Sequence, residues 1–577
     1  MSAYNNPFEY DQAATFAPNF VRDVFIEDHN YTRFIRSNRN VFVVGERGSG
    51  KSMTLLYNSS AVQRLKVENT VEAVATDYLG VYVPCNTPLT QKPEHELMDA
   101  ASASMVSEHL MVLGIAYAIV KSLTFLSDTS FLDGDEGVRN EIAYVLDADL
   151  MPGQPLLRSL MLFLDRESQR SQTALNALRL EEFRRKAYTF ASLVSPLLNT
   201  IRRCPQLANT HFMLLIDDAH DLNAHQKAAL NSWIAYRERS SFSFKVAVAD
   251  VYSYKYTTLS GGTILEGHDF LMIDLQRPFQ SATSDFGRLA EDIVKRRLTM
   301  AGISNRADEF FPLSPEFRKD LEQCRADAKA EADVRYPGAE DSKKRSDYVY
   351  KYARVKYFRE RDARANLPAY SGFDTISHVS TGVIRNLLIP CYWMFDAVYS
   401  SASDEKRGSR ISHIPPDVQS RVLQERSQAL WRWIETSMAS TIDGCTMEDS
   451  KRIYALLDNL ADLFKRRLLK AKAEPRALAF SISGMTDEHE GMIMPLLHIA
   501  RRSQLLYFRS GPSKDDGKRE TYYVPNRMLW PVRGLDVVGQ HARASLKARD
   551  VWAAANGVPF PFDEGPLGQG GLFNDEG

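Results

Sequence analysis

Eight consecutive residues carry the clearest chemistry in this chain: Gly45-Glu46-Arg47-Gly48-Ser49-Gly50-Lys51-Ser52. Their spacing matches that of a phosphate-binding P-loop. Glycines allow successive backbone N–H groups to converge on an anion, and the following helix adds partial positive charge at its N-terminus. In this pattern Lys51 reaches the β- and γ-phosphates, and the Ser52 hydroxyl ligates Mg²⁺. We therefore predict a nucleotide site built from Gly45, Gly48, Ser49, Gly50, Lys51, Ser52 and Met53.

A pair of acids supplies the second half of such a site. Asp217 and Asp218 follow the apolar run 212–216 directly. A continuous apolar run is typical of a strand covered on both faces, and ligands bind at the carboxyl ends of parallel strands. We expect Asp217 to hold Mg²⁺, directly or through water, and Asp218 to polarise the attacking water. The alternative interpretation of these two acids is a simple turn at the end of a strand.

An arginine in the second half of the chain could complete the chemistry. Arg385 stands one turn into a helix that begins after Thr381-Gly382. Reaching from a lid domain, it would stabilise negative charge on the γ-phosphate in the transition state. A capped helix with one surface arginine is the alternative.

Other polar residues near the acid pair point less clearly to a role. His220 and His225 follow it, but no third ligand has suitable spacing, so capping or solvent exposure is favoured over metal binding. Asp250, with Ser253 close by, ends another apolar run where a residue that senses the γ-phosphate could stand. We leave that position open.

The elements that must position these residues follow from the apolar pattern. Strand-like runs at 41–44, 79–84, 211–216, 244–249 and 270–275 alternate with helical patterns. This alternation is typical of an α/β fold with a parallel sheet and crossover helices. The interval of about 90–205 is longer than one crossover needs, so it is predicted to be a helical insertion in the nucleotide-binding domain.

Beyond residue 278 the pattern is helical until two strands appear around the polar turn 510–519. A hairpin after a helical triplet favours a winged helix. We therefore predict a nucleotide-binding domain, a helical lid, a winged-helix-type domain and a disordered tail, over 1–278, 279–400, 401–545 and 546–577.

Composition limits the other possibilities. The 577 residues carry a net charge of -2, so any basic surface must be local. Five scattered cysteines without CxxC spacing argue against a zinc site and a disulfide framework. No signal peptide is apparent, and the apolar stretch 110–120 is too short to span a bilayer, so a buried helix is favoured there. We expect a cytoplasmic protein.

Taken in order along the chain, these motifs resemble the AAA+ ATPases of the origin-recognition-complex type, in particular their bacterial relatives outside replication. The resemblance rests on Asn6-Pro7-Phe8, the P-loop, the acid pair after its strand, the segment 380–388 and the C-terminal hairpin. It implies ATP and Mg²⁺ as cofactors and a sensor-2 role for Arg385. It also implies an ATP-controlled switch that acts on DNA or within assemblies, through self-assembly or a separate effector protein, including in anti-phage defence.

Three features depart from that family's pattern. Asp218 stands where many AAA+ proteins have Glu, and the shorter side chain predicts slow hydrolysis. No arginine lies between Asp250 and Phe270 to serve as an intersubunit finger; Arg237, Arg239 and Arg277 are nearby substitutes. The insertion at 90–205 has no assigned counterpart.

Two segments could contact nucleic acid. In 343–361, cations alternate with aromatics, which suits phosphate contacts and base stacking, but an amphipathic lid helix explains the same spacing and is favoured. The winged helix carries Arg501, Arg502, Arg509, Lys514, Lys518 and Arg519, and could bind double-stranded DNA or a protein. The competing function is therefore a nucleotide-holding scaffold with little turnover. A metabolic kinase is disfavoured because no acceptor site is readable.

Overall fold

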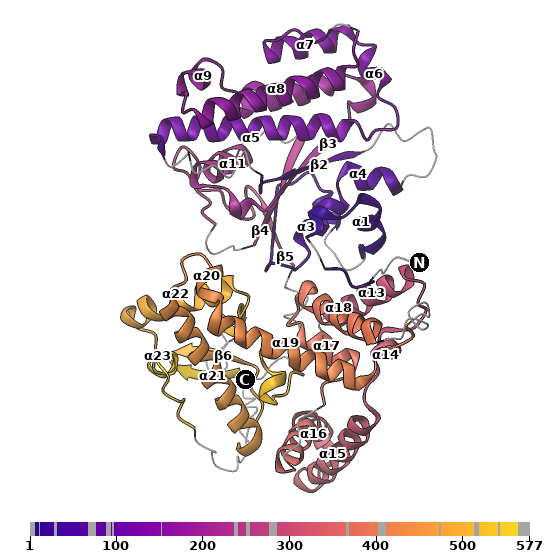
Figure 1. The fold of residues 1–577 in the computed structure, drawn as a ribbon, viewed down its shortest axis with the longest axis vertical. Coiled ribbons are helices and arrows are strands. Elements are labelled where there is room, and N and C mark those ends of the chain that lie inside the picture. Colours follow the sequence, from indigo (N-terminus) through magenta and orange to yellow (C-terminus); the bar gives the residue numbers. More distant parts are fainter. Residues whose placement is uncertain are drawn as a thin grey trace. The chain divides into compact units, whose positions relative to one another are not determined.

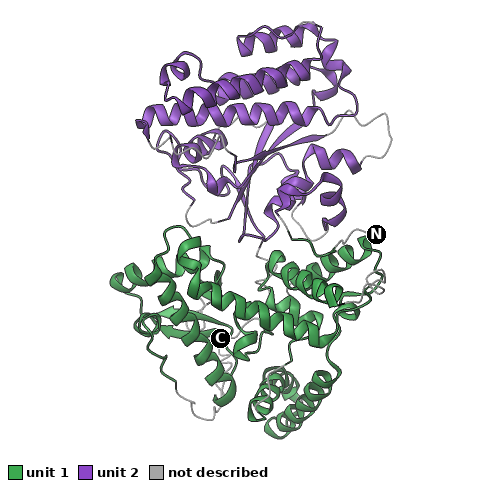
Figure 2. Ribbon diagram, viewed as in Figure 1, with its two compact units in different colours: residues 1–10, 278–577 green, residues 11–277 purple. Residues whose placement is uncertain are grey.

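The computed structural model describes residues 6–10, 12–27, 32–66, 77–87, 94, 97–151, 153–235, 241–249, 254–275, 285–364, 369–401, 411–471, 475–512, 519–539 and 543–562. The chain forms two compact units, shown in Figure 2. Unit 2 spans residues 11–277, and unit 1 combines residues 1–10 with 278–577.

Unit 2 is built on a five-stranded parallel sheet (Figure 1). The strands are β1 (Val41–Val44), β2 (Tyr78–Pro84), β3 (His211–Asp217), β4 (Phe242–Val248) and β5 (Leu271–Asp274). Their order across the sheet is β2-β3-β4-β1-β5. The predicted α/β fold with a parallel sheet is therefore confirmed.

Alternate residues of each strand enter two different cores. In β1, Phe42 and Val44 belong to the larger core, whereas Val41 and Val43 pack with Leu55 on the other face. Successive strand residues point to opposite faces of a sheet. Burial of both faces explains why these strands read as continuous apolar runs.

Helices cover both faces of this sheet. Near the P-loop lie α1 (Pro18–Val24), α2 (Thr32–Ile35), α3 (Lys51–Tyr57) and α4 (Ser60–Gln63). The larger core includes residues of α11 (Ala224–Ala235) and of the helices that connect β2 to β3. Those connecting helices are α5 (Ala100–Leu123), α6 (Ser130–Asp133), α7 (Glu136–Leu146), α8 (Leu156–Asn176), α9 (Leu180–Arg185) and α10 (Ser195–Ile201). No strand occurs in the described part of 90–205, which is the interval predicted as a helical insertion.

The apolar helix α5 is longer than the sequence suggested. It has 24 residues, so by length and composition it could cross a membrane, and the expectation that its apolar stretch is too short was wrong. It packs against β2, α8 and α11 within unit 2, and Figure 1 shows α5 and α8 side by side. Since most of its side chains are buried among these elements, α5 is a core helix of the unit.

Most helices of unit 1 precede its strands along the chain. They are α13 (Asp285–Met300), α14 (Ala307–Phe310), α15 (Pro315–Arg335), α16 (Ser342–Ala363), α17 (Phe373–Val379), α18 (Ile384–Ser401), α19 (Pro416–Thr436), α20 (Met438–Thr441) and α21 (Met447–Lys470). The N-terminal segment belongs here as well. Phe8 is buried among Phe310, Phe311 and Phe395, and Asn6 donates a hydrogen bond to Tyr392 O.

A small mixed sheet lies at the C-terminal end of unit 1. It contains β6 (Ala479–Ser483), β7 (Leu506–Pro512), β8 (Arg519–Pro525) and β9 (Arg543–Lys547), in the order β7-β8-β6-β9. The helix α22 (Asp487–Arg502) joins β6 to β7. β7 and β8 form an antiparallel hairpin, β8 pairs antiparallel with β6, and β9 pairs parallel with β6.

The predicted start of the disordered tail, residue 546, is too early in the sequence. β9 continues to Lys547, and α23 (Ala548–Ala555) follows it directly. Ala548, Val551 and Ala555 are buried at helical spacing, and α23 packs on α21 and α22. This apolar face orders the segment, while residues 563–577 lie outside the described part of the chain.

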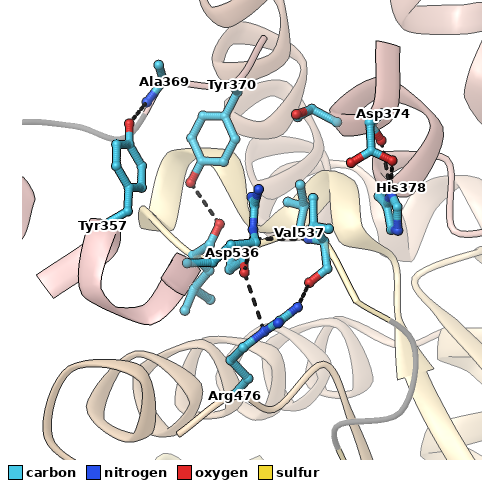
Figure 3. Close-up of polar contacts among 12 residues, drawn as sticks. Tyr357, Ala369, Tyr370, Asp374, His378, Arg476, Asp536 and Val537 are labelled. Carbon is cyan, nitrogen blue, oxygen red and sulfur yellow. Dashed lines mark hydrogen bonds and ion pairs between the residues drawn. The ribbon is translucent and has the colours of Figure 1, made fainter. Parts of the chain in front are cut away.

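A buried polar network joins α16 to the segment before β9 inside unit 1. Asp536 accepts hydrogen bonds from Arg354, with Nη2 at 2.7 Å from Oδ1, and lies 3.5 Å from Nε of Arg476. Tyr370 OH donates to Leu535 O at 2.9 Å beside them (Figure 3). Asp536 thus has two guanidinium partners. Its contact with Arg354 connects α16 to the segment that precedes β9.

Candidate functional site

The P-loop connects β1 to α3 in unit 2, and its backbone requires glycine. Gly48 and Gly50 have φ of 84° and 101°, a region that residues with a Cβ rarely adopt. At Gly45, a Cβ would lie 2.6 Å from Ser49 Oγ, which is closer than real Cβ contacts. The glycines therefore allow the loop to turn tightly between the sheet and α3.

Lys51, the first residue of α3, is buried beneath this loop. Its Nζ donates to Gly45 O at 2.8 Å and to Glu46 O at 3.0 Å. Burial lowers the pKa of Lys51 to about 8, although the carboxylate of Asp217 acts in the opposite direction. The ammonium is thus held inside the loop that would surround a phosphate chain.

Asp217 ends β3 and meets the P-loop across the intervening strand β4. The Ser52 hydroxyl donates to Asp217 Oδ1 at 3.1 Å, so the structure brings together two predicted residues that are 165 positions apart. Asp217 is only 1% exposed, and burial raises its pKa. A desolvated carboxylate next to a hydroxyl is a favourable place for a small divalent cation.

Asp218 follows in a left-handed conformation with φ of 54°. Its backbone N–H donates to Asp217 Oδ1 at 3.0 Å, and its side chain is partly buried. Its negative charge is close enough to raise the pKa of Lys51 against the larger effect of burial. Asp217 thus faces Ser52, while Asp218 follows the strand end, close enough for its charge to add to the rise in the pKa of Asp217 that burial causes.

Sequence reasoning missed a third residue at this carboxylate. The Tyr82 hydroxyl, from the neighbouring strand β2, donates to Asp217 Oδ2 at 2.7 Å. No local motif marks Tyr82, because its role depends on β2 lying beside β3 in the sheet. Only the strand order could have identified it.

His220 and His225 belong to no group of potential metal ligands within the described part of the chain. Burial lowers the pKa of His220 to about 4, so its ring is neutral near pH 7, and Nε2 lies 3.4 Å from Asp221 Oδ1. Among the described residues, no cluster of three His, Cys, Asp or Glu side chains suits a metal ion. A Mg²⁺ ion needs no such cluster, since it binds through one or two protein groups together with nucleotide phosphates and water. Ser52 and Asp217 fit that requirement.

The remaining predicted residues lie elsewhere. Arg385 is partly buried in the first turn of α18, after Thr381 and Gly382, both of which have positive φ. It belongs to unit 1 and the P-loop to unit 2, so its contact with a γ-phosphate stays a prediction. Five further candidates, the sensor position and the substitutes for an arginine finger, lie outside the described residues: Asp250, Ser253, Arg237, Arg239 and Arg277.

A family model identifies the family to which this chain belongs. Among curated proteins, none matches this chain. The model of the ORC-CDC6-like family matches residues 6–546, which include the P-loop, the acid pair, Arg385 and the C-terminal sheet. Because the match covers nearly the whole chain and both units, this protein belongs to the ORC-CDC6-like family, a group of AAA+ P-loop nucleotide-binding proteins.

Proposed function

We propose that this protein is a Mg²⁺-dependent ATPase whose nucleotide state controls its assembly and its engagement of DNA or a protein partner. The observation that carries the proposal is the hydrogen bond of 3.1 Å between Ser52 and Asp217. It joins the P-loop to the acid at the end of β3, which is where a nucleotide-bound Mg²⁺ would lie.

Each side chain has a defined role in this proposal. The backbone of the P-loop and Lys51 bind the phosphates, and Ser52 and Asp217 hold Mg²⁺. Held by Ser52 and Asp217, Mg²⁺ would supply positive charge that neutralises the negative charge developing on the phosphates. Asp218 orients the attacking water and accepts its proton, and Arg385 is the residue proposed to stabilise negative charge on the γ-phosphate.

The length of Asp218 supports slow turnover. Its carboxylate is one methylene shorter than that of Glu and extends from a left-handed backbone with φ of 54°. Its reach toward a water beyond the γ-phosphate is correspondingly short. A slow hydrolysis step suits a switch, because the ATP-bound state then persists long enough to be read by a partner.

The C-terminal region of unit 1 supports engagement of a partner. The order β6, α22, β7, β8, with β6 paired to β8, is compatible with a winged-helix-type domain. Two of its cations are buried against aromatic rings, Arg501 against Phe508 and Arg509 against Tyr507. Contact with DNA would therefore fall to exposed residues such as Arg502 and Arg519, while Lys514 and Lys518 lie outside the described residues.

The helix α16 offers weaker support for DNA binding. Two of its cations pair with carboxylates of α15: Lys356 lies 2.5 Å from Glu331 and Arg361 lies 2.7 Å from Asp320. Val355 and Phe358 are buried, which favours the packed lid helix. We therefore propose that DNA or a partner protein is bound through the winged-helix-type domain; the role in anti-phage defence is carried by the family resemblance alone.

Turnover of ATP with and without double-stranded DNA tests the proposal. We expect slow hydrolysis that DNA stimulates and that Asp218→Asn abolishes without loss of nucleotide binding. Asp147→Asn is a matched control, since Asp147 is exposed in the insertion and has a similar φ of 49°. Stable nucleotide occupancy without turnover in the wild-type protein would instead favour a scaffold that binds protein partners.

A further inference from the structure

The Asp217 carboxylate has two oxygens with different partners. Oδ1 accepts hydrogen bonds from Ser52 Oγ and from the backbone N–H of Asp218, at 3.1 and 3.0 Å. Oδ2 accepts one from the Tyr82 hydroxyl at 2.7 Å. The shortest of these three contacts therefore comes from a residue outside both nucleotide-binding motifs.

The sheet register explains how Tyr82 reaches this acid. Tyr82 on β2 is paired with Leu215 on β3, so Asp217 is its diagonal neighbour, two residues further along on the same face. Diagonal neighbours lie about 7–8 Å apart, a span that a tyrosine side chain can cross. The hydroxyl at the end of the ring is what makes the contact.

The chemistry of this partner matters as much as its position. A tyrosine hydroxyl donates a hydrogen bond without neutralising the carboxylate, whereas an arginine would supply a competing positive charge. The hydrogen bond from Tyr82 therefore orients Asp217 without adding a positive charge that would compete with a metal ion. With Oδ2 held by Tyr82, Oδ1 is the oxygen directed at Ser52.

We propose that Tyr82 is a positioning residue for the Mg²⁺ site, which orients Asp217 so that Oδ1 and the Ser52 hydroxyl face the same ion. The inference rests on the proposed function, because it assigns a role at that same site. Partners that hydrogen-bond to a metal-ligating carboxylate typically change metal affinity by about 10–100-fold when they are removed.

Tyr82→Phe tests the proposal, and Tyr78→Phe is its matched control. Tyr78 lies on the same strand and face, but its hydroxyl donates to Gln63 Oε1 at 3.2 Å. Both substitutions remove one hydroxyl and keep the ring. Binding of a fluorescent ATP analogue to the full chain would be measured in EDTA and then over a Mg²⁺ titration, with Mn²⁺ binding followed by electron paramagnetic resonance.

We expect Tyr82→Phe to raise the Mg²⁺ and Mn²⁺ concentrations for half-saturation by about tenfold or more. Affinity for the analogue in EDTA should stay unchanged, which also shows that the variant is folded, and Tyr78→Phe should behave as the wild type. Equal metal dependence in the two variants would overturn the role of Tyr82 and leave the ATPase intact. A wild-type protein whose nucleotide binding ignores Mg²⁺ would overturn both proposals.

Discussion

Two buried aspartates in this chain have partners of different charge. Asp217 in unit 2 and Asp536 in unit 1 are 1% and 4% exposed. The partners of Asp217 are two hydroxyls and a backbone N–H, whereas Asp536 has the guanidinium groups of Arg354 and Arg476. Burial is thus nearly the same, and the partners differ in charge.

The pKa values of the two acids respond in opposite directions. Burial raises the pKa of Asp217, and the hydroxyl hydrogen bonds only partly offset that effect. Burial also raises the pKa of Asp536, but the two arginines outweigh it and hold the pKa below its ordinary value. Arginine partners neutralise the charge of a buried carboxylate. Hydroxyl partners donate hydrogen bonds but leave the negative charge, so such a carboxylate still attracts a cation. Three experiments can break or sharpen this comparison.

The largest effect is expected from Asp536→Asn. This change leaves Arg354 and Arg476, whose side chains are 17% and 9% exposed, without their charge partner, and breaking a largely buried pair in this way costs about 3–5 kcal/mol. Urea denaturation combined with hydrogen exchange on unit 1 peptides would measure the loss. The control is Asp333→Asn, which breaks the exposed pair with Arg345 and should cost no more than about 1 kcal/mol. Equal losses in the two variants would refute the distinction.

Mild acid should destabilise unit 2 before unit 1. His109 is buried in the insertion, where Nδ1 accepts from Tyr188 N and Nε2 contacts Ser171, and burial lowers its pKa to about 4. The unfolded chain binds this proton near its ordinary pKa of about 6.5 and the folded chain does not, so stability is lost as pH falls from about 6.5 to 4. The loss reaches about 3 kcal/mol. The lowered pKa of Asp536 keeps its contribution to unit 1 intact over this range.

Hydrogen exchange over a pH series, resolved by peptide, would measure this difference. His109→Gln keeps an acceptor and a donor but removes the titration, so its unit 2 peptides should lose less protection between pH 6.5 and 4. An unchanged profile in this variant would show that another group controls the acid response.

A smaller effect is expected from Asp217→Asn. Without metal or nucleotide the variant should be about as stable as the wild type, because loss of the attraction to the buried Lys51 ammonium is offset by removal of a desolvated charge. With Mg²⁺ and nucleotide at 100 times their Kd, the wild type gains about 2.7 kcal/mol, and the variant should lose the Mg²⁺-dependent part of that gain. Thermal melts with EDTA and with Mg²⁺ would measure both quantities. A large loss in EDTA would mean that Asp217 is a structural residue like Asp536.

Much of the site could be predicted because its signals are local. The P-loop is one contiguous motif, and Asp217 is marked by the apolar run of its own strand. The parallel sheet was equally readable, since strands buried on both faces give continuous apolar runs. Segment ends were less certain: α5 proved longer than its apolar centre, and α23 lies in a region that composition had assigned to a tail.

By itself the sequence determined which groups are available for chemistry: a phosphate-binding loop, two acids after a strand, and a stripe of cations and aromatics at 343–361. The tertiary structure decided which of them remain free to act. Strand order brought Tyr82 to Asp217, and the packing of α15 on α16 gave Lys356 and Arg361 carboxylate partners. The physical reason is that a motif consists of neighbours along the chain, whereas the hydrogen-bond and charge partners of a side chain are its neighbours in space.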